Sequence, residues 1–305
     1  MSVRGKYVAL GCAQLGDLYG GLQTEVADEL LEVAWDVGIR RWDTAPLYGC
    51  GVSERRLGHA LGGRSRDEVI ITSKVGRLVT EEGRITRGGV VPGQWEWDYS
   101  PDGLTRGLEA SLDRLQVDFV DVALLHDPQN RSLAEGAAAV ESLAELKASG
   151  LARQVGVGTG DAERAMELLA TGAVDVLLLA GRYTLLEHAK GERVLELADK
   201  FGTEVVLGGV FNSGLLASNG GSAGFFEYSV ADAPTTQRVQ ELLRLCERFR
   251  VPLRTAAIRF ALEQPLAAGI VVGADSAAQV RQIVADASAD VDLLPLWAEL
   301  GRHES

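Results

Sequence analysis

The feature that most constrains the fold is a regular alternation of short apolar runs with longer amphipathic segments along the 305 residues. Each of eight runs rich in Val, Ile and Leu is followed by a segment with apolar residues at helical spacing. Near-continuous apolar runs are typical of strands that are buried on both faces of a parallel sheet. The pattern predicts an α/β fold, a single (β/α)8 TIM barrel. Its predicted strands are 7–11, 39–42, 69–73, 119–125, 152–157, 174–179, 204–207 and 270–272.

Two segments interrupt this alternation. The first runs from Val75 to Tyr99 and is rich in Gly, Arg and aromatic residues, and the second runs from Gly208 to Pro234. We expect both to be long loops, and long loops in compact domains are usually functional or disordered. No linker-like stretch divides the chain, so residues 1–305 are expected to form one domain.

Composition and charge exclude several classes of partner. The formal net charge of −13 disfavours nucleic acid and anionic membrane, since both attract basic patches. No apolar run reaches the length of a membrane span, and the first residues lack a secretory apolar region. The three cysteines are unclustered, which indicates no disulfide framework and favours a cytoplasmic protein. His59, His188 and His303 lack ligand spacing, so no metal is expected, and no pattern indicates an oligomeric state.

Four polar groups follow the ends of three predicted strands. Asp43 comes directly after one strand and Tyr48 lies five residues further on, in a loop held by Pro46 and Gly49. Lys74 and His126 each directly follow another predicted strand. In a parallel barrel the carboxyl ends of the strands share one face, where active sites lie. Taken singly each group is more often structural, but together they predict a catalytic site.

The four groups suit hydride transfer at a carbonyl carbon. A phenol with an ordinary pKa near 10 is a poor acid or base at neutral pH, and a nearby ammonium lowers that pKa. Lys74 is therefore expected to tune Tyr48, and Asp43 to hold Lys74. His126 is expected either to orient the carbonyl oxygen or to help relay its proton. The hydride has to come from a cofactor.

The motifs around these groups resemble those of the aldo-keto reductase family. They are Asp43-Thr44-Ala45-Pro46-Leu47-Tyr48-Gly49, Ser53-Glu54, Leu57-Gly58, Ile71-Thr72-Ser73-Lys74 and Leu124-Leu125-His126. The resemblance implies a (β/α)8 barrel that binds NAD(P)H, with Asp43, Tyr48, Lys74 and His126 as the catalytic tetrad. Further stretches resemble the branch of aldose 1-dehydrogenases, which includes L-fucose, D-threo-aldose and pyridoxal dehydrogenases. They are 15–20, 180–186 and 208–214.

The chain departs from the wider family at two cofactor positions. Gly158-Thr159 stands where many members have Ser-Asn to hold the nicotinamide amide, and Thr159 is expected to keep one hydrogen bond. Gly208 or Gly209 stands where many members have a Tyr that stacks on the nicotinamide. Phe211 and Tyr183 are the candidates to replace that ring, with core packing as the alternative for either.

The resemblance also implies residues for cofactor and substrate. The expected cofactor-binding residues are Gly11, Cys12, Asp43, Thr159, Gly209, Val210, Phe211, Asn212, Ser213, Gly273, Asp275 and Gln279. Asp275 and Gln279 stand where members that prefer NADP carry Lys and Arg, so NAD is the expected cofactor, with NADP possible. The alternative is that Asp275 only caps the helix that follows. The expected substrate-binding residues are Tyr19, Tyr48, Trp95, Trp97 and His126.

The expected function is oxidation of an aldose or small aldehyde at C1, from aldose to lactone, with Tyr48 as general acid or base. Its small-molecule substrate is the expected partner. Three alternatives stay open. They are a biosynthetic aldehyde or ketone reductase of the same family, a cofactor-binding regulatory barrel without turnover, and a lyase that uses Lys74 as a Schiff-base nucleophile.

Overall fold

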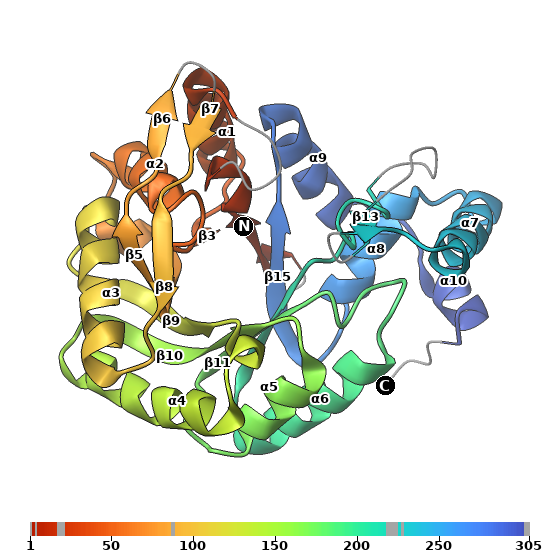
Figure 1. Ribbon diagram of the computed structural model, residues 1–305. Coiled ribbons are helices and arrows are strands. Elements are labelled where there is room, and N and C mark those ends of the chain that lie inside the picture. Colours follow the sequence, from red (N-terminus) through yellow and green to blue (C-terminus); the bar gives the residue numbers. More distant parts are fainter. Residues whose placement is uncertain are drawn as a thin grey trace.

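Eight parallel strands close into a barrel in the computed structural model, which describes residues 2–3, 5–16, 22–86, 89–217, 225–226 and 229–301. The first strand, β2, pairs with both β15 and β3, and this double pairing closes the ring (Figure 1). The predicted fold is thereby confirmed. The barrel strands are β2 (Lys6–Gly11), β3 (Arg41–Asp43), β4 (Ile70–Val75), β9 (Val120–His126), β10 (Ala152–Thr159), β11 (Val176–Ala180), β12 (Glu204–Gly208) and β15 (Ala267–Gly273).

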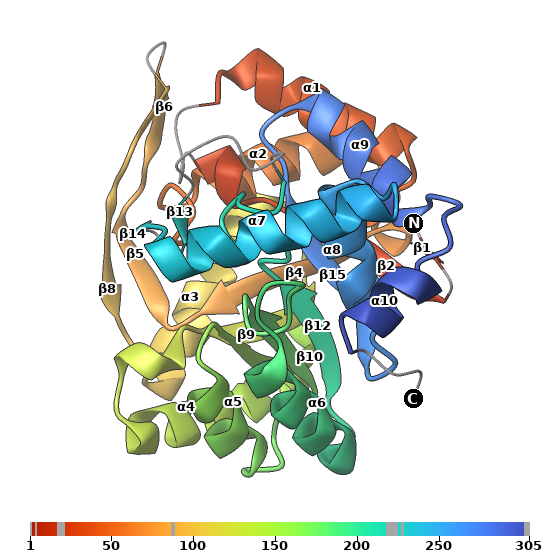
Figure 2. The same ribbon diagram turned by 90° about the vertical axis from the view of Figure 1, so that its right-hand side faces the viewer.

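Helices surround the barrel and cover the outer face of its strands (Figures 1 and 2). Their apolar stripes pack on the outward Val, Leu and Ile side chains, which buries one continuous core. The helices are α1 (Thr24–Asp36), α2 (Val52–Leu61), α3 (Pro101–Leu115), α4 (Leu133–Ala148), α5 (Ala162–Leu169), α6 (Ala189–Phe201), α7 (Ala233–Arg248), α8 (Leu253–Leu262), α9 (Ala277–Ala287) and α10 (Leu294–Glu299). Three short 3-10 segments are η1 (Ala13–Gly16), η2 (Arg66–Glu68) and η3 (Pro128–Asn130).

The inside of the barrel is filled by a second, smaller apolar cluster. Val122, Leu124, Val176, Leu178 and Val206 form it, and they alternate along their strands with the outward residues. Near the opposite end from the strand carboxyl termini, the Tyr7 hydroxyl donates to Glu204 Oε1 at 2.9 Å. The barrel is therefore a packed core rather than a channel, and a ligand site is expected at the carboxyl ends of its strands.

The segment between β4 and α3 differs from the structureless loop predicted for it. It forms a two-stranded antiparallel ribbon of β5 (Arg77–Glu81), β6 (Arg84–Thr86), β7 (Gly89–Val91) and β8 (Gln94–Trp97). We call these strands, 77–97, the arm; it runs along the left edge of Figure 2, with β6 at the top and β5 and β8 below it. Short stretches rich in Val, Ile and Thr alternate there with polar residues, which favours strands despite the glycines.

The second predicted loop is mostly turns over 209–217, followed by β13 (Phe225–Phe226) and β14 (Ser229–Val230). At the start of the chain, β1 (Ser2–Val3) pairs antiparallel with β2.

Candidate active site

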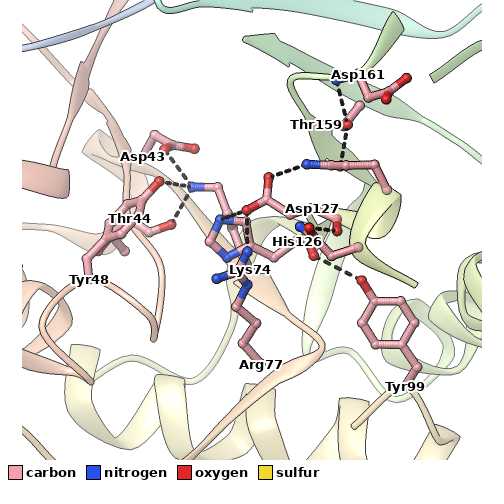
Figure 3. A network of polar contacts seen from close by, with 12 residues as sticks. Asp43, Thr44, Tyr48, Lys74, Arg77, Tyr99, His126, Asp127, Thr159 and Asp161 are labelled. Atoms are coloured by element: carbon pink, nitrogen blue, oxygen red, sulfur yellow. Dashed lines mark hydrogen bonds and ion pairs between the residues drawn. The ribbon is translucent and has the colours of Figure 1, made fainter. Parts of the chain in front are cut away.

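Three neighbouring strands carry the polar side chains at the mouth of the barrel. Asp43 ends β3, Lys74 lies near the end of β4, and His126 ends β9. Tyr48 reaches the same place from the turn after β3, where its N–H donates to the carbonyl of Ala45. The structure thus brings the four predicted groups together (Figure 3).

Lys74 is the centre of this group. Its ammonium, 2 % exposed, donates to Asp43 Oδ1 at 2.7 Å, to the Thr44 carbonyl at 2.9 Å and to the Tyr48 hydroxyl at 3.1 Å. Although burial opposes it, the negative charge of Asp43 and the contact with Tyr48 raise the pKa of Lys74. The amine is therefore a buried ammonium whose three donors are all used.

Close backbone packing fixes the position of Tyr48. A Cβ on Gly16 would lie 2.2 Å from the carbonyl carbon of Tyr48, so only glycine permits the two segments to meet. Beside it, the Ser53 hydroxyl donates to the Cys12 carbonyl at 2.7 Å and lies 2.8 Å from the Thr44 hydroxyl. Ser53 lies in the first turn of α2, and the residue that caps this helix is Gly51, with φ 88°. The Tyr48 turn is tied to the first strand through α2.

The pKa of Tyr48 departs from the expectation. Burial raises the pKa of the phenol to about 12, although the Lys74 ammonium lowers it. The sequence places the ammonium correctly, but it does not show how deeply the hydroxyl is buried. Lys74 therefore offsets only part of the burial cost of the phenolate.

His126 packs its ring edge-on against Tyr48, with 6.0 Å between ring centroids. Burial, with the positive charges of Lys74 and Arg77, lowers the pKa of His126 well below its ordinary value. The ring is therefore neutral at neutral pH. Its Nε2 lies 3.6 Å from Asp127 Oδ2, while Nδ1 is buried and has no hydrogen-bond partner among the described residues.

The other five strands carry mostly small residues at or next to their carboxyl ends. Gly158 is in register with His126, Ala180 with Gly208, and Gly273 with Gly11. A Cβ on Gly273 would lie 2.4 Å from Gln14 Nε2, so the amide of Gln14 covers this glycine. The mouth thus has a polar half on β3, β4 and β9, and a glycine half on β10, β11, β12, β15 and β2.

Thr159 at the end of β10 and Tyr183 after β11, which were expected or considered to contact the cofactor, already contact other residues of the protein. The Thr159 hydroxyl donates to Gln129 Oε1 at 2.7 Å and accepts from the Asp161 N–H at 3.0 Å. Tyr183 is 2 % exposed and stacks on Phe260 with 5.1 Å between centroids, so the core alternative holds for this ring. Phe211 is half-buried and packs on the main core.

The turn after β12 has an unusual backbone. Gly209, Asn212, Ser213 and Gly214 all have positive φ, at 65°, 47°, 57° and 97°. Non-glycine residues rarely adopt this conformation without compensation from their surroundings. Asn212 is buried, and its Oδ1 finds no partner within the part of the chain that the structure describes. Val210 points into the core, as does Cys12 after β2, so each offers only its backbone to a ligand.

Asp275 does not cap α9, so the alternative role considered for it is wrong. The cap is Ser276, whose hydroxyl accepts from the Gln279 N–H. Gln279 in turn accepts the N–H of Asp275 at 3.0 Å through Oε1. Asp275 is exposed, and its carboxylate is not the cap of this helix.

The predicted substrate aromatics lie on the arm. Trp95 and Trp97 pack edge-on with 5.2 Å between centroids, and the Arg77 guanidinium lies over both rings at 4.8 and 4.5 Å. Arg77 then binds Asp127 Oδ2, next to His126. Tyr19 lies outside the described residues.

Sequence reasoning missed Arg77, Asp127, Gln129 and Gln14. A signal for Asp127 was present, because it directly follows a strand-terminal histidine. The other three gave no signal, because the arm, η3 and η1 bring Arg77, Gln129 and Gln14 to the mouth from separate segments.

The chain belongs to the aldo/keto reductase family, whose model matches residues 7–292. It is therefore an oxidoreductase of a family that uses nicotinamide cofactors. It is 35% identical to D-threo-aldose 1-dehydrogenase of a Pseudomonas species, over 95% of this chain and 91% of that protein. It is also 35% identical to pyridoxal 4-dehydrogenase of Microbacterium luteolum, over 91% of this chain and 88% of the relative.

The fold is similar to that of an aldo-keto reductase from Bacillus halodurans solved in its holo form. The TM-score is 0.71 and the identity 26%, over 93% of this chain and 87% of that one. No helix in the described ranges is long and apolar enough to cross a membrane. In the same ranges, no three His, Cys, Asp or Glu side chains gather as metal ligands would.

Proposed function

We propose that the protein transfers hydride between a nicotinamide cofactor, preferably NAD, and C1 of an aldose or small aldehyde. Tyr48 is the general acid for reduction and the general base for oxidation. The observation that carries this proposal is the Lys74 ammonium, which contacts the Tyr48 hydroxyl at 3.1 Å and Asp43 at 2.7 Å. A fixed positive charge beside a phenol stabilises the phenolate that proton transfer produces.

Each residue of the polar half has a different role toward the substrate oxygen. With a pKa of about 12, Tyr48 is protonated at neutral pH, which suits proton donation to a carbonyl oxygen. His126 is neutral and carries one N–H, which suits a hydrogen bond that orients the same oxygen. Asp43 keeps the ammonium in place and balances its charge. The bound cofactor supplies or accepts the hydride.

The glycine half fits a dinucleotide. Its rim of Gly158, Gly208 and Gly11 leaves room for a flat ring beside the Gln14 amide, which covers Gly273. The buried Asn212 Oδ1 and Gln14 Oε1 are acceptors without partners among the described residues. The turn of positive-φ residues at 209–214 suits a close approach of backbone to a pyrophosphate. We assign cofactor binding to this turn, to the backbone of Gly11 and Cys12, to Asp43 and Thr159, and to Gly273, Asp275 and Gln279.

Two of the alternatives lose support from the geometry. A Schiff-base nucleophile has to be a neutral, accessible amine. Lys74 is buried, uses all three donors, and has a raised pKa. The complete tetrad argues against a regulatory barrel without turnover. Reduction of aldehydes or ketones in biosynthesis uses the same groups in the opposite direction, and only the substrate distinguishes it.

The 35% identity to an aldose dehydrogenase and a pyridoxal dehydrogenase supports a polar substrate of aldose size. Because all three cysteines are buried and free, we place the reaction in the cytoplasm, carried out by one domain.

A substrate screen tests the proposal. The purified protein is offered a panel of aldoses and aldehydes with NAD⁺ and with NADP⁺, and the absorbance of the reduced nicotinamide is followed. We expect turnover of aldoses with NAD⁺. Activity on large apolar ketones alone would instead identify a ketone reductase. Cofactor binding without single turnover of any substrate would favour the regulatory barrel.

A further inference from the structure

Asp127 is a carboxylate at the mouth that the tetrad does not include. It directly follows His126, and its side chain is 29% exposed. Oδ2 lies 2.5 Å from Arg77 Nη2 and 3.6 Å from His126 Nε2, and Oδ1 accepts from Gln129 Nε2 at 3.3 Å (Figure 3). The carboxylate is thus held beside the ring nitrogen that faces the reacting oxygen in the proposed reaction.

The backbone of Asp127 is held in an unusual conformation. Its φ is 48°, in the left-handed region, where Asp is among the few tolerated non-glycine residues. The N–H donates to the Gly158 carbonyl at 2.9 Å, which pins the residue to the neighbouring strand. Asp127 stands at the cap position of η3 but makes no side-chain cap hydrogen bond. The strained backbone therefore aims the carboxylate at the mouth rather than at the helix.

We propose that Asp127 binds the hydroxyl on the carbon next to the reacting carbonyl, and so selects aldoses and other 2-hydroxy aldehydes. This inference rests on the proposed function. The carbonyl and 2-hydroxyl oxygens of such a substrate lie about 2.8 Å apart in a gauche arrangement, as covalent geometry dictates. Hydrogen bonds of about 2.7–2.9 Å from the first oxygen to His126 and from the second to Asp127 would span the 3.6 Å between Nε2 and Oδ2.

The surroundings of Asp127 leave it able to accept this hydrogen bond. An ionised carboxylate has about four acceptor sites. Arg77 and Gln129 use one each, and the Gln129 contact is long at 3.3 Å. Arg77 is itself held by the rings of Trp95 and Trp97. These arm aromatics, predicted to touch the substrate, thus position the carboxylate through Arg77.

The competing role for Asp127 is to orient His126, as carboxylates do in other catalytic sites. The 3.6 Å separation is longer than a hydrogen bond, which disfavours this role in the structure. The two roles predict different outcomes. An orienting residue affects every substrate equally, whereas a hydroxyl-binding residue affects only substrates that carry the hydroxyl.

The test compares two aldehydes that differ only by that hydroxyl, glycolaldehyde and acetaldehyde. Each is reduced with NADH by the unmodified enzyme and by Asp127→Gly and Asp127→Asn. Glycine adopts φ 48° freely, so Asp127→Gly removes the carboxylate without backbone strain. Asp127→Asn keeps the shape and the tolerance of that φ but loses the charge. Glu187→Gln, which removes another carboxylate from the loop after β11, is the control.

We expect the unmodified enzyme to prefer glycolaldehyde in kcat/KM. Asp127→Gly should lower the glycolaldehyde-to-acetaldehyde ratio about tenfold or more, as loss of a hydrogen bond to a charged group does. Asp127→Asn should lower it less, and Glu187→Gln should leave it as it was. Trp97→Leu, which loosens Arg77, should lower the ratio in the same sense by a smaller factor.

An unmodified enzyme that reduces both aldehydes equally well overturns the inference and leaves the proposed function standing. The same holds if Asp127→Gly and Asp127→Asn reduce both substrates less but by the same factor, since Asp127 then serves His126. Failure of the unmodified enzyme to turn over any aldehyde or aldose with either cofactor overturns both proposals.

Discussion

The two halves of the barrel mouth are built on opposite principles. On β3, β4 and β9 the strands carry Asp43, Lys74 and His126 at or next to their carboxyl ends. Lys74 contacts Asp43 and Tyr48 within 3.1 Å, and the ring of His126 packs edge-on against that of Tyr48. By contrast, β11, β12, β15 and β2 end in alanine or glycine, and Gly158 is the last residue but one of β10. One half thus offers reactive groups, and the other offers space and backbone.

The contrast is what the proposed function requires, since one barrel then binds both a cofactor and a substrate. Proton transfer needs few groups in fixed positions, and in the polar half Lys74 and Asp43 are buried and ion-paired. A dinucleotide needs a long, shallow surface with close backbone approach, so side chains on the rim would obstruct it. Each half is therefore open to its own test, and a substitution on one half should leave the other working.

The largest expected effect belongs to Tyr48→Phe on the polar half. Loss of the hydroxyl removes the group that moves the proton, while the ring still packs against His126. General acid–base groups contribute about 10²–10⁴-fold, so kcat should fall in that range. Cofactor affinity, measured by titration, should stay near that of the unmodified enzyme. Half-normal turnover in this variant would remove Tyr48 from the mechanism.

Lys74→Met is expected to lower kcat about 10²-fold and to shift its pH profile. Lys74 lowers the pKa of Tyr48 against the effect of burial, so removing the ammonium raises that pKa further. Oxidation requires the phenolate, so the rising limb of the kcat profile for oxidation should move to higher pH. A partly active variant with an unmoved limb would show that Lys74 does not tune the phenol. Tyr48→Phe is the control, since its profile should lack this limb.

Gly208→Val tests the glycine half alone. A Cβ there meets no atom closer than 3.4 Å, so the strand accepts it, but the branched side chain enters the proposed cofactor space. Overpacking of this kind typically costs about 1–3 kcal/mol, which corresponds to roughly tenfold to hundredfold weaker cofactor binding. The matched control is Gly136→Ala in α4, where a Cβ meets nothing closer than 3.7 Å. Unchanged cofactor affinity in Gly208→Val would place the cofactor elsewhere.

The same contrast explains what the sequence could predict. Strand runs are visible as apolar stretches, and Asp43, Lys74 and His126 are visible because a polar residue ends each run. The glycine half has few side chains that would mark it in the sequence, so its contacts had to be inferred from the resemblance. Tyr183 illustrates the limit, because an aromatic residue after a strand reads the same whether it faces a ligand or, as here, the core.

Two further features could not be predicted from the sequence, because one depends on how deeply a side chain is buried and the other on contacts between distant segments. The pKa of Tyr48 rises because burial outweighs a correctly predicted neighbour. Arg77 reaches Asp127 because the arm folds as a ribbon against the mouth, whereas its glycines favoured a loop. The arm was therefore the largest structural feature that local sequence reasoning did not predict.

The smallest expected effect concerns the choice between NAD and NADP at the outer end of the glycine half. Asp275 is exposed at the start of α9, and Ser276, not Asp275, caps that helix. Its carboxylate is therefore available to accept hydrogen bonds from ribose hydroxyls, as acidic residues do in other dinucleotide sites. A 2′-phosphate at the same place would be repelled by about 1–2 kcal/mol in a partly screened site.

We expect the unmodified enzyme to favour NAD over NADP by about tenfold or more in kcat/KM, since 1.4 kcal/mol is a factor of ten. Asp275→Arg should narrow or reverse this ratio while kcat with either cofactor changes little, because the substitution is remote from the polar half. Asp36→Arg, an exposed position at the end of α1, makes the same change of net charge and should leave the ratio as it was. Equal efficiency with both cofactors in the unmodified enzyme would show that Asp275 does not discriminate. Equal shifts in the two variants would assign the preference to overall charge, because only a local contact depends on where the charge is placed.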